Sequence, residues 1–187
     1  RVALDALEAK LLARGISVDE AVEAVTSSRR KLPAFEDFSR VRSLLAAAKV
    51  PAVLVEVTRC ERAGEPLVVM SDHLVVVEAL AARPGWAAIT GSVTVPERGR
   101  IVAAFQRGEL AGVACTIAAA GVGLTLTRAC ELVFADQNWR WGVNAQTEDR
   151  VHRIGQTRPV TITILVADHA LDRRVMAVLR EKAQRND

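Results

Sequence analysis

The chain has 187 residues, half of them apolar, and its 25 basic and 22 acidic side chains give a net charge of +3. This length suits one α/β domain with a small helical addition, and the apolar fraction can build a core without metals or disulfides. No apolar run approaches the roughly 20 residues of a membrane-spanning helix, so no membrane partner is expected. A charge this close to neutral neither requires nor excludes nucleic acid.

The first 63 residues have the apolar spacing of helices. Val2–Arg14 is the first of them, and Ser17 begins a second. A third helix is predicted over 35–49, and Pro51 suits the first turn of a fourth that stops at Gly64. The sequence starts with arginine and shows no signal-peptide pattern, which indicates a fragment of a longer protein.

After residue 64, apolar runs of strand length alternate with helical stretches. Strands are predicted at 67–71, 86–90, 113–118, 132–135 and 160–166. Helices are predicted at 72–82, capped by Asp72, at 94–107, where Thr94 and Glu97 form a capping box, and at 143–154 and 168–184. Continuously apolar strands that alternate with helices are typical of a parallel sheet covered on both faces. We therefore predict an α/β domain over 64–187, preceded by a helical segment over 1–63.

Several common site patterns are missing from the sequence. The three cysteines and three histidines have neither metal-ligand spacing nor a CxxC pair, so reduced thiols and no metal site are expected. No GxxxxGK[ST] loop is present to hold a triphosphate. Asp136 ends an apolar strand in the manner of a magnesium ligand, but no phosphate loop precedes it.

A second resemblance, to a dinucleotide fold, comes from two glycines that follow a strand, Gly121 and Gly123. The third glycine position of that fingerprint holds Leu126. Only eight residues separate Gly123 from Leu132, fewer than the dozen or so of a βαβ crossover. The glycine pair is better explained by a close backbone approach.

The most informative stretch is 146–156, which reads QTEDRVHRIGQ. On a continuous helix Gln146, Arg150 and Arg153 share one face, presenting an amide and two guanidinium groups. This donor set suits the oxygens of a transferring phosphate. The alternative is a solvated helix face with ion pairs to its own acidic residues. Three residues that can pack inward lie one position further round: Thr147, Val151 and Ile154.

Residues 146–159 resemble motif VI of the Swi/Snf-type ATPases, within the superfamily-two helicases. Other segments resemble further motifs of that family in the family's order. Residues 67–73 (LVVMSDH) resemble motif IV, and 119–126 (AAGVGLTL) resemble motif V. The block after motif IV is matched by ITGS at 89–92 with Arg98 and FQ at 105–106, and the linker into motif VI by Asp136 and Trp139. The segment 38–52 is similar to the inter-lobe segment of bacterial relatives of the annealing-helicase branch.

This resemblance implies the RecA-like C-terminal lobe of an ATP-dependent double-stranded DNA translocase. In such motors ATP with Mg²⁺ sits between two RecA-like lobes. The first lobe supplies the phosphate loop and the Asp-Glu magnesium motif, and neither is in this sequence. The implied partners are duplex DNA and the N-terminal lobe, and the isolated chain is expected to be inactive. The alternative is a non-catalytic nucleic-acid-binding or interaction module derived from such a lobe.

The family motifs assign roles to individual residues. Motif VI implies arginine fingers at Arg150 and Arg153, with Gln146 beside the nucleotide, and motif V places Gly121 and Gly123 near the cleft. The residues that the resemblance assigns to DNA are Ser71, His73, Gly91, Ser92, Thr125 and Trp139.

Some alternatives remain open from the sequence. Ser71 and Thr125 could be ordinary strand-end caps, and Trp139 and Trp141 could be packing aromatics. Thr90 stands where the family usually has Asp, and Arg140-Trp141 stands where it usually has Asn-Pro. The protein is expected in the cytoplasm with the nucleoid if bacterial and in the nucleus if eukaryotic. The sequence does not choose among fork remodelling, annealing and protein displacement.

Overall fold

The computed structural model describes residues 13, 20, 35–121 and 123–184. Apart from residues 13 and 20, the predicted helices Val2–Arg14 and that beginning at Ser17 lie outside this part of the chain. The described helices are α3 (Phe35–Ala63), α4 (Leu74–Ala81), α5 (Val95–Arg107), α6 (Ile117–Ala120), α7 (Trp141–Glu148) and α8 (Ala170–Gln184). The strands are β1 (Leu67–Ser71), β2 (Trp86–Ile89), β3 (Gly112–Thr116), β4 (Glu131–Phe134) and β5 (Thr161–Ile164).

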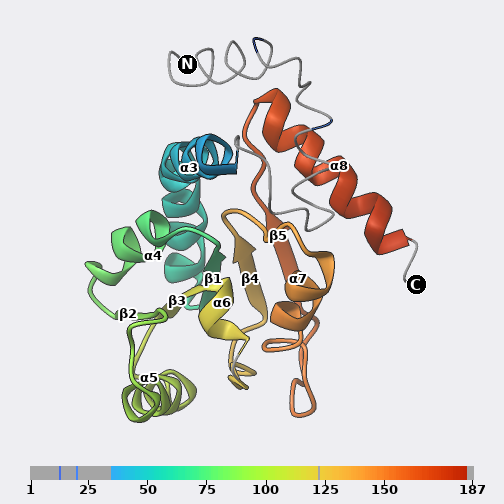
Figure 1. Cartoon of the computed structure of the whole chain (residues 1–187). Coiled ribbons are helices and arrows are strands. Elements are labelled where there is room, and N and C mark those ends of the chain that lie inside the picture. The colour runs from blue at the N-terminus through green and yellow to red at the C-terminus, as the bar shows by residue number, and fades with distance from the viewer. Residues whose placement is uncertain (1–12, 14–19, 21–34, 122, 185–187) are drawn as a thin grey trace.

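The strands form one five-stranded sheet in the order β2-β3-β1-β4-β5, and every pair is parallel. Leu67 of β1 is in register with Gly112 on one side and with Glu131 on the other, so β1 is the central strand. All five of its residues are buried, as expected for a strand covered on both faces. The predicted parallel α/β architecture is confirmed (Figure 1).

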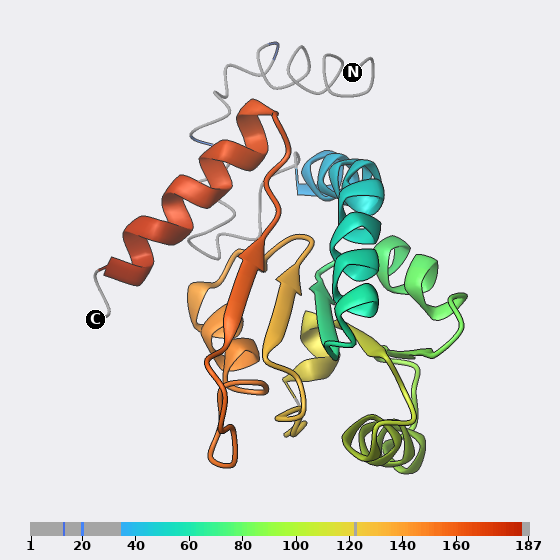
Figure 2. The ribbon, with the colours of Figure 1, turned by 180° about the vertical axis from the view of Figure 1, so that it is seen from behind.

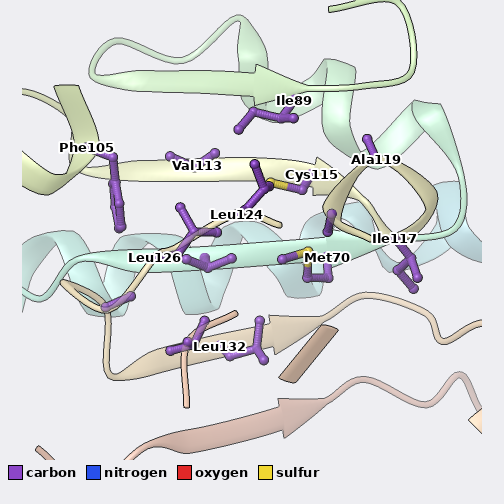
Figure 3. Packing of buried hydrophobic residues seen from close by; sticks show 14 of the residues in the cluster. Met70, Ile89, Phe105, Val113, Cys115, Ile117, Ala119, Leu124, Leu126 and Leu132 are labelled. Carbon is purple, nitrogen blue, oxygen red and sulfur yellow. The ribbon is translucent and has the colours of Figure 1, made fainter. Parts of the chain in front are cut away.

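Alternate residues of each strand point to opposite faces of the sheet, and different helices cover the two faces. Leu67 and Val69 pack with apolar residues of α3 and α4. Val68 and Met70 pack with α5, α6 and the segment that follows α6. Figure 3 shows this second cluster, in which Phe105 and Leu126 lie against the strands. Each large side chain buried in this way contributes about 1.5–3 kcal/mol.

The helices α3 and α8 extend beyond the sheet. Figures 1 and 2 show α8 beside the β5 edge. A buried ion pair between Lys49 of α3 and Asp172 of α8, 2.6 Å long, joins the two helices. The second half of α3 contributes Val53 and Val57 to the core, while the division of the chain at residue 64 stays a prediction.

The prediction of two helices on either side of Pro51 is wrong, because α3 is continuous from Phe35 to Ala63 with Pro51 inside it. Proline removes one backbone hydrogen bond and crowds the preceding turn, so it kinks a helix without always ending it. In Figure 2 the two halves of α3 run in different directions. Both halves bury apolar residues, Leu45 before the proline and Val57 after it, and this packing holds the helix together across the kink.

Helix ends differ from the predictions in two further places. The cap of α4 is His73, whose side chain makes no capping bond, and not Asp72. The short helix α6 was not expected, because four residues, one isoleucine and three alanines, are too few to show a periodic pattern. The predicted start of α5 is confirmed, since the Thr94 hydroxyl accepts from the Glu97 amide at 3.4 Å. So is its end at Gly108, which is left-handed with φ 86°.

The three cysteines are free and buried, as their spacing predicts. Within the described residues, no helix is long and apolar enough to cross a membrane.

Candidate functional site

The predicted helix over 143–154 ends six residues early, because α7 stops at Glu148 and the chain continues in turns. In these turns the Arg150 amide donates to the Thr147 carbonyl, and the Val151 amide donates to the Glu148 carbonyl. Val151 is fully buried and anchors the turn, as predicted. Ile154 is fully exposed, so its predicted inward packing is wrong. The prediction assumed a helical period at residue 154, but the helix ends at Glu148.

The three polar residues of motif VI still come together without a continuous helix. Gln146, Arg150 and Arg153 line one open depression of about 400 Å³. Asp149 and His152 complete its polar lining. The turn therefore presents the same side chains that the helical spacing placed on one face.

Both arginines bind the loop that follows α6. A terminal nitrogen of Arg150 donates to the Gly121 carbonyl at 3.3 Å. Arg153 donates to the Thr125 hydroxyl at 3.2 Å and to the Leu124 carbonyl at 3.5 Å. These bonds bring the motif V and motif VI segments into one site.

Two backbone features shape the motif V loop. The Leu126 amide donates to the Arg150 carbonyl at 2.9 Å, which ties the loop to the arginine turn. Gly123 is exposed and adopts φ +60°, a conformation that side-chain-bearing residues rarely take. The loop beside the predicted nucleotide residues therefore requires glycine at position 123, because of this backbone conformation.

The donor set of this depression fits the phosphate groups of a nucleotide. The Nε atom of Arg150 is buried without a hydrogen-bond partner, and the Arg153 side chain is exposed. A guanidinium group has a planar fork of N–H donors, which can make two parallel hydrogen bonds to the oxygens of one phosphate. Among the described residues, no group of three or more His, Cys, Asp or Glu side chains is placed to hold a metal ion.

The chain after the arginines is fixed by Gln156. Its amide nitrogen donates to the Thr127 carbonyl at 3.1 Å and to the Ala129 carbonyl at 2.6 Å. Arg158 follows with an ion pair to Glu65 at 2.7 Å. Both contacts fix the turn before Pro159.

A second polar cluster lies where β1 and β4 end. The Ser71 hydroxyl donates to Asp136 at 2.6 Å, and the Asp72 amide donates to the other Asp136 oxygen at 2.7 Å. Burial raises the pKa of Asp136, while the charge of Arg42 and the Ser71 bond oppose that rise. The carboxylate is thus held within the protein.

Ser71 itself is fully buried. With no exposed surface, its side chain cannot make the predicted contact with a DNA phosphate in this structure. Its hydroxyl also lies 3.0 Å from the His73 amide, which donates to it. These contacts favour the alternative, in which Ser71 organises the end of the strand.

His73 and Trp139, both assigned to DNA from sequence, are partly buried beside this cluster. Burial lowers the pKa of His73, so its imidazole is neutral near pH 7. The Trp139 ring stacks against the guanidinium of Arg42, whose central carbon lies 4.2 Å from the ring centroid. Sequence reasoning missed Arg42; the available signal was an arginine beside Val41, on the apolar side of a predicted helix.

The remaining DNA-assigned residues, Gly91 and Ser92, are exposed in the loop after β2. The Ser92 hydroxyl pairs with that of Thr90 at 2.8 Å, so threonine keeps a local hydrogen bond at the position where the family usually has Asp. Arg98 donates to the Thr90 carbonyl at 3.4 Å and to the Ala119 carbonyl at 3.5 Å. This loop is therefore connected to α6 and the motif V segment.

Comparisons with known proteins agree with this arrangement. Residues 36–155 match the family model described as "Helicase conserved C-terminal domain". The chain is 40% identical over 122 residues to the mouse DNA annealing helicase and endonuclease ZRANB3, covering 62% of this chain and 11% of that protein.

Two further similarities extend the comparison. Identity is 36% over 144 residues to the SWI/SNF-related matrix-associated actin-dependent regulator of chromatin subfamily A-like protein 1 of Xenopus tropicalis, covering 73% of this chain and 15% of that protein. The fold is similar to the crystal structure of the C-terminal part of the Fun30 ATPase domain, with a TM-score of 0.58 and 22% identity, covering 64% of this chain and 41% of that one.

The chain thus spans only a small part of the curated relatives that it matches. The residues that match the family model contain strands β1 to β4, the motif V loop and the arginine turn described above. The chain belongs to the helicase conserved C-terminal domain family, with a RecA-like fold and with Swi/Snf-type proteins among its relatives.

Proposed function

We propose that this lobe is the second motor domain of an ATP-dependent double-stranded DNA translocase. The observation that carries the proposal is the open depression in which Arg150 and Arg153 contact the motif V loop. Such a site offers guanidinium donors to phosphate oxygens. It also contacts Thr125, a residue that the family resemblance assigns to DNA.

Arg150 and Arg153 are the arginine fingers in this proposal. Bound ATP with Mg²⁺ supplies the phosphoanhydride bond and the metal charge, and a first RecA-like lobe supplies the phosphate loop and magnesium carboxylates. The guanidinium groups stabilise the negative charge that develops on the phosphate oxygens. Gln146 orients the same oxygens through its amide. Gly121 and Gly123 keep the loop close to the cleft.

Thr125 is the point at which nucleotide and DNA sites meet. Its hydroxyl accepts a hydrogen bond from Arg153, and the family resemblance assigns it to the DNA backbone. If Arg153 turns toward phosphate, the Thr125 hydroxyl loses that donor. The nucleotide state can therefore reach a DNA-binding residue through one hydrogen bond.

The DNA surface in this proposal contains Gly91, Ser92, His73 and the exposed part of Trp139. Small exposed residues allow a phosphate to approach the backbone, and the tryptophan can contact a groove. Such contacts position a duplex without reading its bases. The protein then acts wherever its DNA is, in the nucleoid of a bacterium or the nucleus of a eukaryote.

Substitution of Arg153 in a protein that carries both lobes tests the proposal. We expect Arg153→Ala to lower DNA-stimulated ATP turnover by roughly 10³–10⁵-fold, because the finger acts on charge that develops during phosphoryl transfer. Arg153→Lys should fail nearly as badly, since lysine keeps the charge and loses the planar fork. Steady-state ATP hydrolysis with saturating duplex DNA measures both effects.

Arg100→Ala is a matched control, because Arg100 is also exposed and its ion pair to Glu97 lies on α5. It should keep wild-type turnover. Near-wild-type rates for both Arg153 variants, in protein that is folded and DNA-bound, would contradict the finger assignment. They would favour the non-catalytic binding module.

A further inference from the structure

One guanidinium connects three segments of the lobe. Arg42 of α3 is 4% exposed, and it donates to Asp72 at 3.4 Å and to the carbonyl of Gln137. It also lies 3.9 Å from Asp136 and stacks on the Trp139 ring. Its partners come from the loops that follow β1 and β4.

This geometry suits arginine in particular. The edge of a guanidinium plane carries its N–H donors, while its face can stack on an aromatic ring. Arg42 uses both at once, with the carboxylates and the carbonyl as acceptors and Trp139 against its face. An ammonium group has no comparable flat face. The stacking fixes the ring that the proposed function directs to DNA.

We propose that Arg42 is a positioning residue for Trp139, holding the ring ready for duplex DNA and tying its position to helix α3. The inference rests on the proposed DNA role of this lobe. It assigns no contact with DNA to Arg42, which is buried. Arg42 thereby links α3 directly to the loop that carries Trp139.

Lys49 provides an internal comparison. It lies seven residues after Arg42, so it is on a similar side of the helix, and it is also buried and ion-paired. Its partner is Asp172 of α8. Replacing either cation with glutamine removes one positive charge and its ion pairing, with Asp172 for Lys49 and with Asp72 and Asp136 for Arg42. Only Arg42 is stacked on Trp139.

The position of Trp139 can be measured in the 187-residue chain labelled with 5-fluorotryptophan. The three resonances are assigned with single Trp→Phe variants. Arg42→Gln and Arg42→Lys should shift or broaden the Trp139 resonance, since both remove the stacked plane. Lys49→Gln should leave it unchanged. An unchanged Trp139 resonance in the Arg42 variants, with the Trp86 resonance native, overturns the proposal.

The DNA role is measured by duplex affinity at fixed salt for Arg42→Gln, Trp139→Ala and the double variant. Arg42→Gln should weaken binding about 2- to 10-fold relative to Lys49→Gln. Without the stacked guanidinium, the Trp139 side chain is no longer held in place and must be ordered when DNA binds. In the Trp139→Ala background the same change should have no further effect. Equal losses for the Arg42 and Lys49 variants, or additive losses in the double variant, overturn the proposal.

The two failures are distinguishable. If the wild-type chain does not bind duplex DNA, the proposed function fails, and the fluorine resonances still decide whether Arg42 positions the ring. If the chain binds DNA but Trp139→Ala does not weaken binding, the DNA part of this inference is overturned.

Discussion

At the scale of single residues, Ser71 shows how a family-assigned position can serve the fold. Its hydroxyl donates to buried Asp136 and accepts from the His73 amide. A buried carboxylate needs such partners, since an unmet hydrogen-bonding group inside a protein is costly. The residue therefore organises the strand end beside the proposed DNA surface.

We predict that Ser71→Ala lowers the free energy of unfolding by about 1–3 kcal/mol, because one Asp136 oxygen loses its hydroxyl donor. Duplex affinity of the folded chain should change little. Ser92→Ala is the control for stability, since Ser92 is exposed and should stay within about 0.5 kcal/mol of wild type. Urea denaturation and DNA titration measure the two quantities. A large affinity loss without destabilisation would restore the direct DNA contact for Ser71.

At the scale of elements, the pairing of β2 with β3 depends on a glycine beneath a tryptophan. Trp86 and Gly112 are in register, and a Cβ atom built on Gly112 would lie 2.4 Å from the Trp86 ring. No real Cβ tolerates that approach. The edge strand β2 can therefore pair with β3 in this register because Gly112 has no side chain.

We predict that Gly112→Ala destabilises the chain by about 1–3 kcal/mol, as overpacking of a buried site does. Gly99→Ala is the matched control, because Gly99 lies inside α5 with open space at its Cβ. That change should be stabilising by about 0.5–1 kcal/mol, since alanine favours helix over glycine. Thermal and urea unfolding compare the two. Equal effects of the two alanines would show that Trp86 does not constrain Gly112.

The end of α3 is joined to the same strand by Glu61. Its carboxylate accepts from Arg83 at 2.7 and 2.6 Å and from the Trp86 indole at 2.9 Å. These contacts, and the Arg83 bonds most of all, lower the pKa of Glu61 below its ordinary value of 4.5. A depressed carboxyl pKa stabilises the fold above the unfolded-state pKa, and this contribution is lost as pH falls through the folded-state value.

We predict that Glu61→Gln lowers the free energy of unfolding by about 1–2 kcal/mol at pH 7, a partly solvent-screened loss of charge-assisted bonds. The difference from wild type should shrink as the pH falls from 4.5 through the lower folded-state pKa, because Glu61 of the folded chain then becomes protonated. Urea unfolding from pH 7 to pH 3 measures it. A difference that stays constant over this range would show that the Glu61 charge does not matter.

At the scale of the whole molecule, the lobe carries arginines but no phosphate loop. The described residues form one sheet with helices on both faces. The proposed nucleotide and DNA residues are linked through Thr125 and Arg98. Turnover in this proposal needs a second lobe that holds the triphosphate.

We therefore expect the 187-residue chain to show no DNA-stimulated ATP hydrolysis, and to bind duplex DNA weakly and without sequence preference. Each phosphate that it neutralises should add about −0.9 to the slope of log affinity against log salt. Titrating duplexes of different sequence at several salt concentrations measures the slope, and a steady-state assay measures turnover. Robust turnover by this chain alone, or a flat salt response, would contradict the proposed division of labour.

The sequence by itself determined the parallel sheet and the grouping of the polar residues around the two arginines. Strands β1 to β4 are short, largely apolar runs, and such runs predict buried parallel strands because both faces must be apolar, whereas the edge strand β5 alternates threonine with isoleucine and is mostly exposed. The grouping of Gln146, Arg150 and Arg153 also followed from sequence, since spacing of three and four residues keeps side chains together in a helix or in consecutive turns.

Only the tertiary structure decided where helices bend and end, and which polar groups are buried. Pro51 stays within α3 because packing on both sides offsets the lost hydrogen bond, a balance that no local pattern contains. Ser71 and Arg42 meet their partners across 65 and 95 residues of sequence. Such contacts depend on which strand ends lie side by side, so neither the burial of Ser71 nor the stacking of Arg42 on Trp139 could be read from the chain.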